Sequence, residues 1–80
     1  MAVWRVSTPA QLSAALSSAR REAGMTQEEL AAWAHVNRRY LTVLEQGRAS
    51  LQVQRLLDVL NVLGYDMVIV PKGHPIDPAR

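Results

Sequence analysis

Two adjacent arginines, Arg38 and Arg39, directly follow Asn37, a residue type that caps helix N-termini well. Gly47 can supply the left-handed residue that closes a helix, so the arginines should start a short helix that runs to about Gln46. A guanidinium group donates two parallel hydrogen bonds, which match the O6 and N7 acceptors of guanine in a DNA major groove. The pair therefore indicates DNA recognition, whereas an arginine pair outside such a motif would more simply be a solvated helix surface.

The inner face of this helix needs the apolar side chains of Leu41 and Leu44, which are three residues apart. The outer face is left with four candidates for reading bases: Arg38, Arg39, Thr42 and Val43. The net charge of the chain is only +2, but residues 38–55 contain four arginines and a single acid, Glu45. The positive field is therefore local to this helix and its surroundings.

The segment before the arginines carries the start signals of another helix. Thr26 and Glu29 have the spacing of a capping box, and Met25 can pack on Leu30 as a hydrophobic staple. A helix should therefore begin at Thr26 and be joined to the arginine helix by a short turn. Two helices connected in this way have the outline of a helix-turn-helix, whose second helix enters the major groove.

Two further helices flank this pair. Thr8 is a good N-cap for a first amphipathic helix, which Gly24 ends. A last helix should begin near Ser50 or Leu51 and end at Gly64, and its apolar surface is too wide for one core face. Without an internal linker or repeat, the four helices should form one compact, mainly α unit.

The segment from Tyr65 to Val70 favours a β-strand, because Tyr, Val and Ile recur in a short run bounded by Gly64 and Pro71. A strand needs a partner for its backbone, and the chain offers the short segment from Val3 to Val6. A second copy of the same strand is the partner that we favour, which predicts a homodimer. The expected dimerisation residues are Tyr65, Met67, Val68, Ile69 and Val70.

The composition limits what the chain can be. Its 80 residues suffice for one domain, expected over residues 1–70, followed by a flexible tail over residues 71–80. There is no cysteine, and His35 and His74 are far apart, so we predict neither a metal site nor a cofactor. The neighbouring acids Glu28 and Glu29 point about 100° apart on a helix, which argues against paired catalytic carboxylates and against an enzyme. With no apolar run of the ~20 residues that span a bilayer, and no signal peptide, a cytoplasmic protein is expected.

The pattern Arg20-Arg21-x-x-Gly24-Met25-Thr26-Gln27-Glu28-Glu29-Leu30-Ala31 resembles the lambda-repressor-like family of helix-turn-helix proteins, also called Cro/repressor or XRE. Within that family the chain looks most like the HipB-type antitoxins of toxin–antitoxin systems. This resemblance rests on the N-terminal segment Ser7-Thr8-Pro9-x-Gln11-Leu12 and on a last helix that ends Leu63-Gly64 before a hydrophobic strand. It covers roughly Trp4 to Val70.

The resemblance implies a four-helix DNA-binding domain that dimerises through a shared two-stranded β-lid. Such a dimer would bind a pseudo-palindromic operator in double-stranded DNA, repress its own operon and bind a HipA-like serine/threonine kinase toxin. A phage-type or restriction-system repressor without a toxin partner is the alternative, because it would share the same helix-turn-helix.

The resemblance also implies roles for single residues. Gln27 stands where the family holds a DNA phosphate, although the simpler interpretation is a polar residue in a first helical turn. Arg38 and Arg39 stand where the family reads bases, and Thr42 and Val43 could touch a thymine methyl or a phosphate. Three residues beside this face are expected to bind phosphates: Asn37, Tyr40 and Arg48.

Two residues raise structural questions. His35 stands in the turn, where the family normally has glycine, so either the turn is strained or its geometry differs. Trp33 lies beside the core positions of the helix that begins at Thr26, and we expect it to pack against a neighbouring helix.

Overall fold

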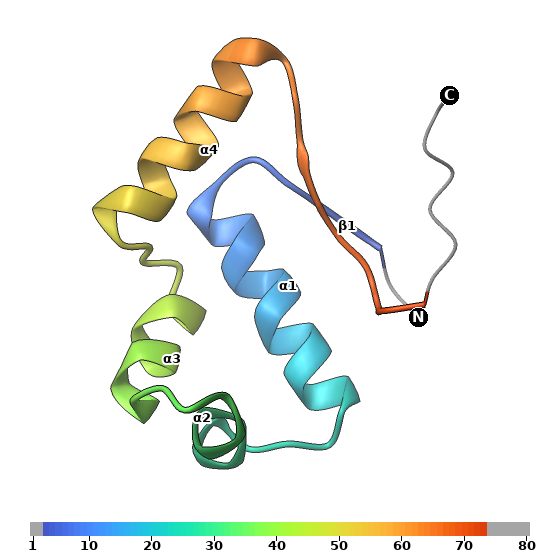
Figure 1. The fold of residues 1–80 in the computed structure, drawn as a ribbon, viewed down its shortest axis with the longest axis vertical. Coiled ribbons are helices and arrows are strands. Elements are labelled where there is room, and N and C mark those ends of the chain that lie inside the picture. Colours follow the sequence, from blue (N-terminus) through green and yellow to red (C-terminus); the bar gives the residue numbers. More distant parts are fainter. Residues whose placement is uncertain (1–2, 74–80) are drawn as a thin grey trace.

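The computed structural model describes residues 3–73, which form four helices and two short strands (Figure 1). Their order is β1 (Trp4–Val6), α1 (Pro9–Glu22), α2 (Gln27–Ala34), α3 (Arg38–Glu45), α4 (Leu51–Leu63) and β2 (Met67–Ile69). In Figure 1, α1 lies between the two strands on one side and α3 and α4 on the other. The expected mainly α class with four helices is confirmed.

Local side-chain signals set the helix boundaries. Thr8 caps α1 and accepts a hydrogen bond from the Gln11 backbone N–H at 3.2 Å. Both halves of the predicted capping box form at α2, with Thr26 N–H to Glu29 Oε1 at 2.9 Å and Glu29 N–H to Thr26 Oγ1 at 3.0 Å. Ser50 caps α4 by accepting from the Val53 N–H at 3.2 Å. These starts were predictable because each depends on residues within one turn of chain.

The turn between α2 and α3 keeps its left-handed residue although that residue is histidine. His35 has φ 58° and ψ 41°, the only non-glycine residue with positive φ in the part of the chain that the structure describes. Its backbone N–H still bonds to the carbonyls of Ala31 and Ala32. Of the two alternatives for His35, the strained turn is therefore the one observed, and an L-residue there costs on the order of 1 kcal/mol.

Replacing His35 by glycine is therefore expected to raise the free energy of unfolding by about 0.5–1 kcal/mol, because glycine adopts the left-handed region without the Cβ clash. Urea denaturation followed by circular dichroism would measure the change. His35→Val is the matched control, since a β-branched residue fits this region worst and should lower stability. A lower midpoint for His35→Gly than for the wild type would show that histidine side-chain contacts outweigh the backbone strain.

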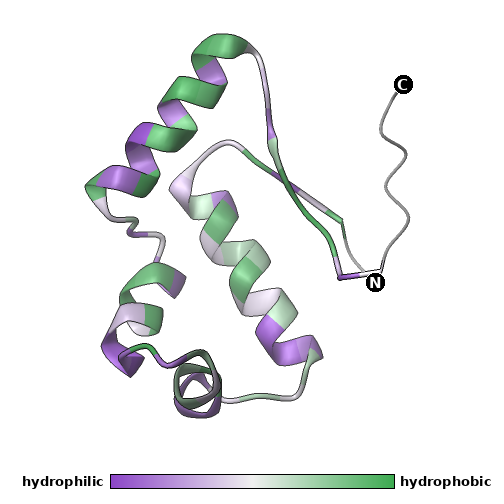
Figure 2. Cartoon of the chain, in the orientation of Figure 1, coloured by the Kyte–Doolittle hydropathy of each residue, from purple (hydrophilic) through white to green (hydrophobic). Residues whose placement is uncertain are grey.

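The core is small and lies where β1, α1 and α4 meet. Val6 and Ala15 are fully buried, and Leu57 is 1% exposed. Partly buried apolar residues surround them: Trp4, Leu12, Val53, Met67 and Ile69. Hydrophobic residues recur along the whole of α4 (Figure 2), but Leu57 is the one that it buries completely.

The strand pairing corrects one prediction. β2 pairs with β1 of the same chain, antiparallel, with Trp4 opposite Ile69 and Val6 opposite Met67. We expected a second copy of the strand to be the favoured partner, but the short N-terminal segment already fills one edge of β2. Pairing within a chain costs no association entropy, and the Asn61 side-chain amide fixes the segment after β1 by donating to the Ser7 carbonyl at 2.9 Å. The strand is also shorter than the predicted 65–70.

Trp33 corrects a second prediction, because its side chain is 78% exposed rather than packed against a helix. It lies two residues after Ala31, the residue of α2 that is buried, and two residues turn a helix by about 200°. The eight-residue α2 packs mainly against α3. The stripe of α2 that α3 covers is too narrow to include Trp33.

The structure describes only part of the predicted C-terminal tail. Residues 74–80, most of the predicted tail, and with them His74, lie outside the described residues. Within residues 3–73, no helix is long and apolar enough to cross a membrane.

Candidate functional site

The outer face of α3 presents its two arginines to solvent. Asn37 caps the helix by accepting from the Arg39 backbone N–H at 2.7 Å, which leaves the Arg38 and Arg39 side chains at the first turn. Leu41 is buried and Leu44 is half-buried, so the opposite face of α3 contacts the protein as predicted. Both arginines are exposed, and neither has an ion-pair partner among residues 3–73. Their guanidinium groups are free to bind an anion or a base edge.

Thr42 and Val43, one turn further along α3, are half-buried rather than exposed. The Thr42 hydroxyl donates toward two oxygens of the protein, Gln27 Oε1 at 3.0 Å and the Arg38 carbonyl at 3.2 Å. The structure thus brings three predicted site residues together where the start of α2 meets the start of α3.

A second group of predicted residues surrounds a shallow hollow on the other side of α3. The hollow lies between α3 and the start of α4, and its lining includes the phosphate candidates Asn37, Tyr40 and Arg48. Arg39 and Val43, both predicted to read bases, line the same hollow. Tyr40 is 51% exposed, so its ring and hydroxyl are accessible there. Five of the residues predicted to contact DNA therefore come together around this hollow.

Gln27 does not extend freely toward solvent as a phosphate ligand would. Its half-buried side chain donates from Nε2 to Glu45 Oε1 at 3.2 Å and accepts from Thr42. A phosphate at this helix start would have the second Nε2 hydrogen and the first backbone N–H groups of α2, which lack intrahelical partners.

A buried ion pair that the sequence reasoning missed holds α3 in place. Glu45 accepts from Arg20 Nε at 2.7 Å and from a terminal guanidinium nitrogen of Arg20 at 2.9 Å. Ser17 donates to the same carboxylate at 2.8 Å, and Arg20 also donates to the Met25 carbonyl at 2.7 Å. The two charged side chains are only 11% and 5% exposed. One carboxylate thus links α1, the start of α2 and the end of α3.

The environment keeps this carboxylate ionised. The hydrogen bond from Arg20 is the main reason that the pKa of Glu45 falls to about 2, with smaller contributions from the Ser17 and Gln27 hydrogen bonds. Burial opposes the shift because it penalises the charged form. The sequence contained a signal for this pair, since Arg20 and Glu45 each follow an apolar residue, Leu16 and Leu41, by one helical turn. A charge on an apolar stripe indicates a buried partner.

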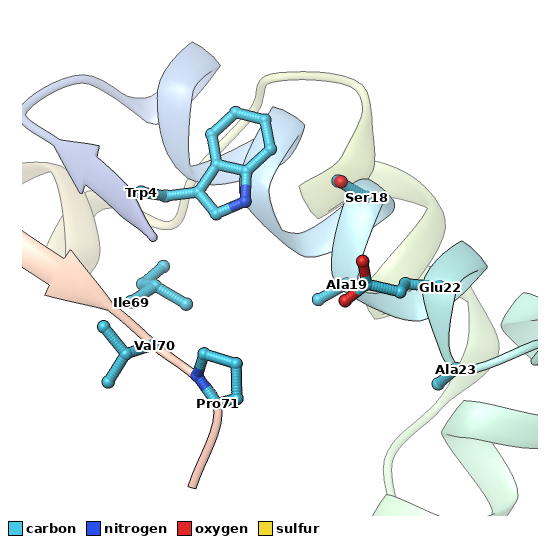
Figure 3. A pocket seen from close by; sticks show the side chains of 8 residues that line it. All are labelled: Trp4, Ser18, Ala19, Glu22, Ala23, Ile69, Val70 and Pro71. Atoms are coloured by element: carbon cyan, nitrogen blue, oxygen red, sulfur yellow. The ribbon is translucent and has the colours of Figure 1, made fainter. Parts of the chain in front are cut away.

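A separate apolar hollow lies on the far side of α1 from α3. It is lined by Trp4 of β1, Ile69 of β2 and the two residues after β2, Val70 and Pro71, together with Ser18, Ala19, Glu22 and Ala23 of α1 (Figure 3). It contains no residue predicted to contact DNA, but it includes the dimerisation candidates Ile69 and Val70. No group of three His, Asp or Glu side chains that could hold a metal ion occurs in residues 3–73.

Comparison of the whole chain with known proteins gave two matches. A model of a family described as a helix-turn-helix domain matches residues 11–68, from within α1 to β2. The chain is 36% identical over 69 residues to a protein of Sinorhizobium fredii named as an uncharacterized HTH-type transcriptional regulator, y4mF. That match covers 86% of this chain and 91% of the relative. No solved structure matches the chain significantly.

Proposed function

The chain belongs to the helix-turn-helix domain family, and from this we propose that it is a transcriptional repressor that reads a pseudo-palindromic operator through α3. The family is one of DNA-binding regulators and not of enzymes, and the relative from Sinorhizobium fredii is named as such a regulator. A bacterial cytoplasmic location follows from this role. The observation that carries the proposal is the exposed arginine pair at the start of a helix that the Arg20–Glu45 ion pair connects to α1.

We divide the proposed DNA contacts into two kinds. Arg38 and Arg39 stand at the exposed tip of α3, where they reach base edges if the helix start enters the major groove. We assign phosphate contacts to the residues beside them, which are Gln27, Asn37, Tyr40 and Arg48. Phosphate contacts fix the position of a protein on the duplex, whereas base contacts select the sequence.

Arg38→Ala and Arg39→Ala are each expected to weaken binding to the operator by about 1–3 kcal/mol and to change binding to random DNA little. The reason is that a bidentate contact to guanine is lost while the phosphate contacts remain. Titration of fluorescent DNA upstream of the gene, and of a scrambled duplex, at two salt concentrations would measure both affinities.

Lys72→Ala is the matched control for this experiment, because Lys72 is an exposed cation three residues after the end of β2 and does not belong to the α3 surface. It should leave operator binding unchanged. If the α3 variants weakened binding to both DNAs equally, the arginines would be phosphate ligands and base reading would have to be assigned elsewhere on α3.

We further propose that the repressor acts as a homodimer. β2 uses one edge to pair with β1, and pairing its other edge with the β2 of a second copy would give a four-stranded sheet. Five apolar residues from the end of α4 to β2 are at least half exposed and would be covered in such a dimer: Val59, Val62, Leu63, Tyr65 and Val68. We call them the α4–β2 apolar face. A homodimer places two recognition helices about 34 Å apart, one turn of the DNA helix.

We also propose that the chain is an antitoxin that binds a HipA-like kinase toxin. This proposal rests on the resemblance of the N-terminal segment and the strand to those of HipB-type antitoxins. The DNA surface around α3 would be occupied in the repressing complex, so such a partner would bind other faces of the chain. Co-purification with the products of adjacent genes tests this proposal. Recovery of the chain without a kinase would favour the alternative, a stand-alone repressor.

A further inference from the structure

The hydroxyl group of Thr42 is oriented by the protein before any DNA is bound. A threonine hydroxyl has one hydrogen to donate and two lone pairs that accept. Both contacts of Thr42 Oγ1 are with oxygens that can only accept, Gln27 Oε1 at 3.0 Å and the Arg38 carbonyl at 3.2 Å. The single hydrogen is therefore directed into the protein, toward one or both of these oxygens.

The orientation of the Gln27 amide depends on Glu45. The Gln27 nitrogen lies 3.2 Å from Glu45 Oε1, and the reversed amide would place an oxygen at that distance from a carboxylate oxygen. Glu45 has no proton to donate at neutral pH, since the ordinary pKa of its carboxyl group is 4.5 and the hydrogen bond from Arg20 lowers that pKa further. The amide oxygen of Gln27 must therefore face Thr42.

Each hydrogen bond between α1 and the DNA surface therefore has a fixed donor and a fixed acceptor. Arg20 donates to Glu45, Gln27 donates to Glu45, and Thr42 donates to Gln27. Gln27 and Thr42 are half-buried, and the side chains of Arg20 and Glu45 are only 11% and 5% exposed, so water competes weakly for these bonds. Reversing any one bond would leave two acceptors or two donors facing each other.

We infer that Thr42 reads the operator as a hydrogen-bond acceptor, which selects a base with an exocyclic amino group in the major groove, adenine through N6 or cytosine through N4. This inference rests on the proposed function. The free lone pairs of Oγ1 accept from an amino group, whereas guanine O6, thymine O4 and a phosphate oxygen all require a donor. A base contact of this kind therefore replaces the phosphate contact that we considered for Thr42 from the sequence.

α3 would then recognise bases in two complementary ways, by donating and by accepting hydrogen bonds. Arg38 and Arg39 can only donate, so they favour guanine. Thr42, one turn later on the same helix, can only accept, so it favours a neighbouring adenine or cytosine. The specificity of Thr42 is set by Glu45, which lies behind the DNA surface and contacts no base.

Selection of binding sites from random duplex DNA would test this inference, with the wild type, Thr42→Val and Thr42→Ser compared. Thr42→Val keeps the shape of the side chain and removes the hydroxyl, and Thr42→Ser keeps the hydroxyl. We expect the wild type and Thr42→Ser to share one adenine or cytosine position in each half-site. Thr42→Val should lose the preference at that position and keep the guanines.

Base analogues then identify the atom that is read. If the position is adenine, purine in its place removes the N6 amino group and should weaken wild-type binding by about 5-fold or more, the equivalent of about 1 kcal/mol. Thr42→Val should lose less than about 2-fold on the same substitution. 7-Deazaadenine, which removes the N7 acceptor, should change wild-type binding little.

Three outcomes would overturn the inference. Sensitivity to loss of N7 with no sensitivity to loss of N6 would show that Thr42 donates. An unchanged selected sequence for Thr42→Val would show that Thr42 reads no base, while the proposed function would stand. Selection of no sequence by the wild type would overturn the proposed function itself.

Discussion

Replacing Glu45 by alanine is expected to lower the free energy of unfolding by about 3–5 kcal/mol, the usual cost of removing one partner from a buried ion pair. The change leaves the Arg20 guanidinium enclosed without its counter-charge, and it removes hydrogen-bond acceptors from Ser17 and Gln27. A domain of this size is stable by roughly 5–10 kcal/mol, so much of its stability would be lost. Urea denaturation at neutral pH, followed by circular dichroism, measures the difference.

Glu22→Ala is the matched control, because Glu22 is an exposed acid at the end of α1 and forms no ion pair within residues 3–73. Its removal should change stability by less than about 0.5 kcal/mol. Comparable losses for the two variants would mean that the Arg20–Glu45 contact contributes nothing beyond a surface pair.

The lowered pKa of Glu45 predicts how the free energy of unfolding depends on pH. The pKa of Glu45 is about 2 in the folded chain against an ordinary value of 4.5, so the unfolded state binds a proton first. This contribution is fully present above about pH 4.5 and is lost as the pH falls from there toward 2. We expect a loss of roughly 2–3 kcal/mol across that interval, and Glu45→Gln should show a correspondingly flatter acid profile. An equally steep profile in Glu45→Gln would assign the acid sensitivity to other carboxylates.

Helix positions could be predicted from the sequence because their signals are local. The Thr26–Glu29 capping box and the caps Thr8, Asn37 and Ser50 each act within one turn, whatever the rest of the chain does. The outward position of the α3 arginines followed in the same way, from the spacing of Leu41 and Leu44.

What could not be predicted depends on contacts between distant segments. The pairing of β1 with β2 joins the two ends of the described chain, and no local pattern distinguishes it from pairing with a second copy. The exposure of Trp33 follows from how little of α2 the neighbouring helices cover. The apolar residue one turn before Glu45 indicated a buried partner, but nothing local identified Arg20 as that partner, because it lies 25 residues away.

Replacing Val62 by glutamate is expected to dissociate the proposed homodimer and to weaken operator binding by at least about 100-fold, because two linked half-site contacts become independent. Val62 is 87% exposed in the single chain, so a charge there costs the monomer little. In the dimer the same charge would lie in the α4–β2 apolar face without a partner, which costs several kcal/mol. Sedimentation equilibrium and operator titration, performed at the same protein concentrations, would measure both effects.

Ala14→Glu provides the control, since it adds the same charge to an exposed position of α1 that belongs neither to the α3 surface nor to the α4–β2 apolar face. It should leave both the association state and operator binding unchanged. If Val62→Glu remained a dimer, the two copies would meet elsewhere and the free edge of β2 would not be their contact. If it became a monomer with unchanged operator affinity, one copy of α3 would suffice for recognition, and the operator would need no two-fold symmetry. Both effects together, with normal unfolding of the variant, would show that the α4–β2 apolar face joins the two copies and that operator binding requires both of them.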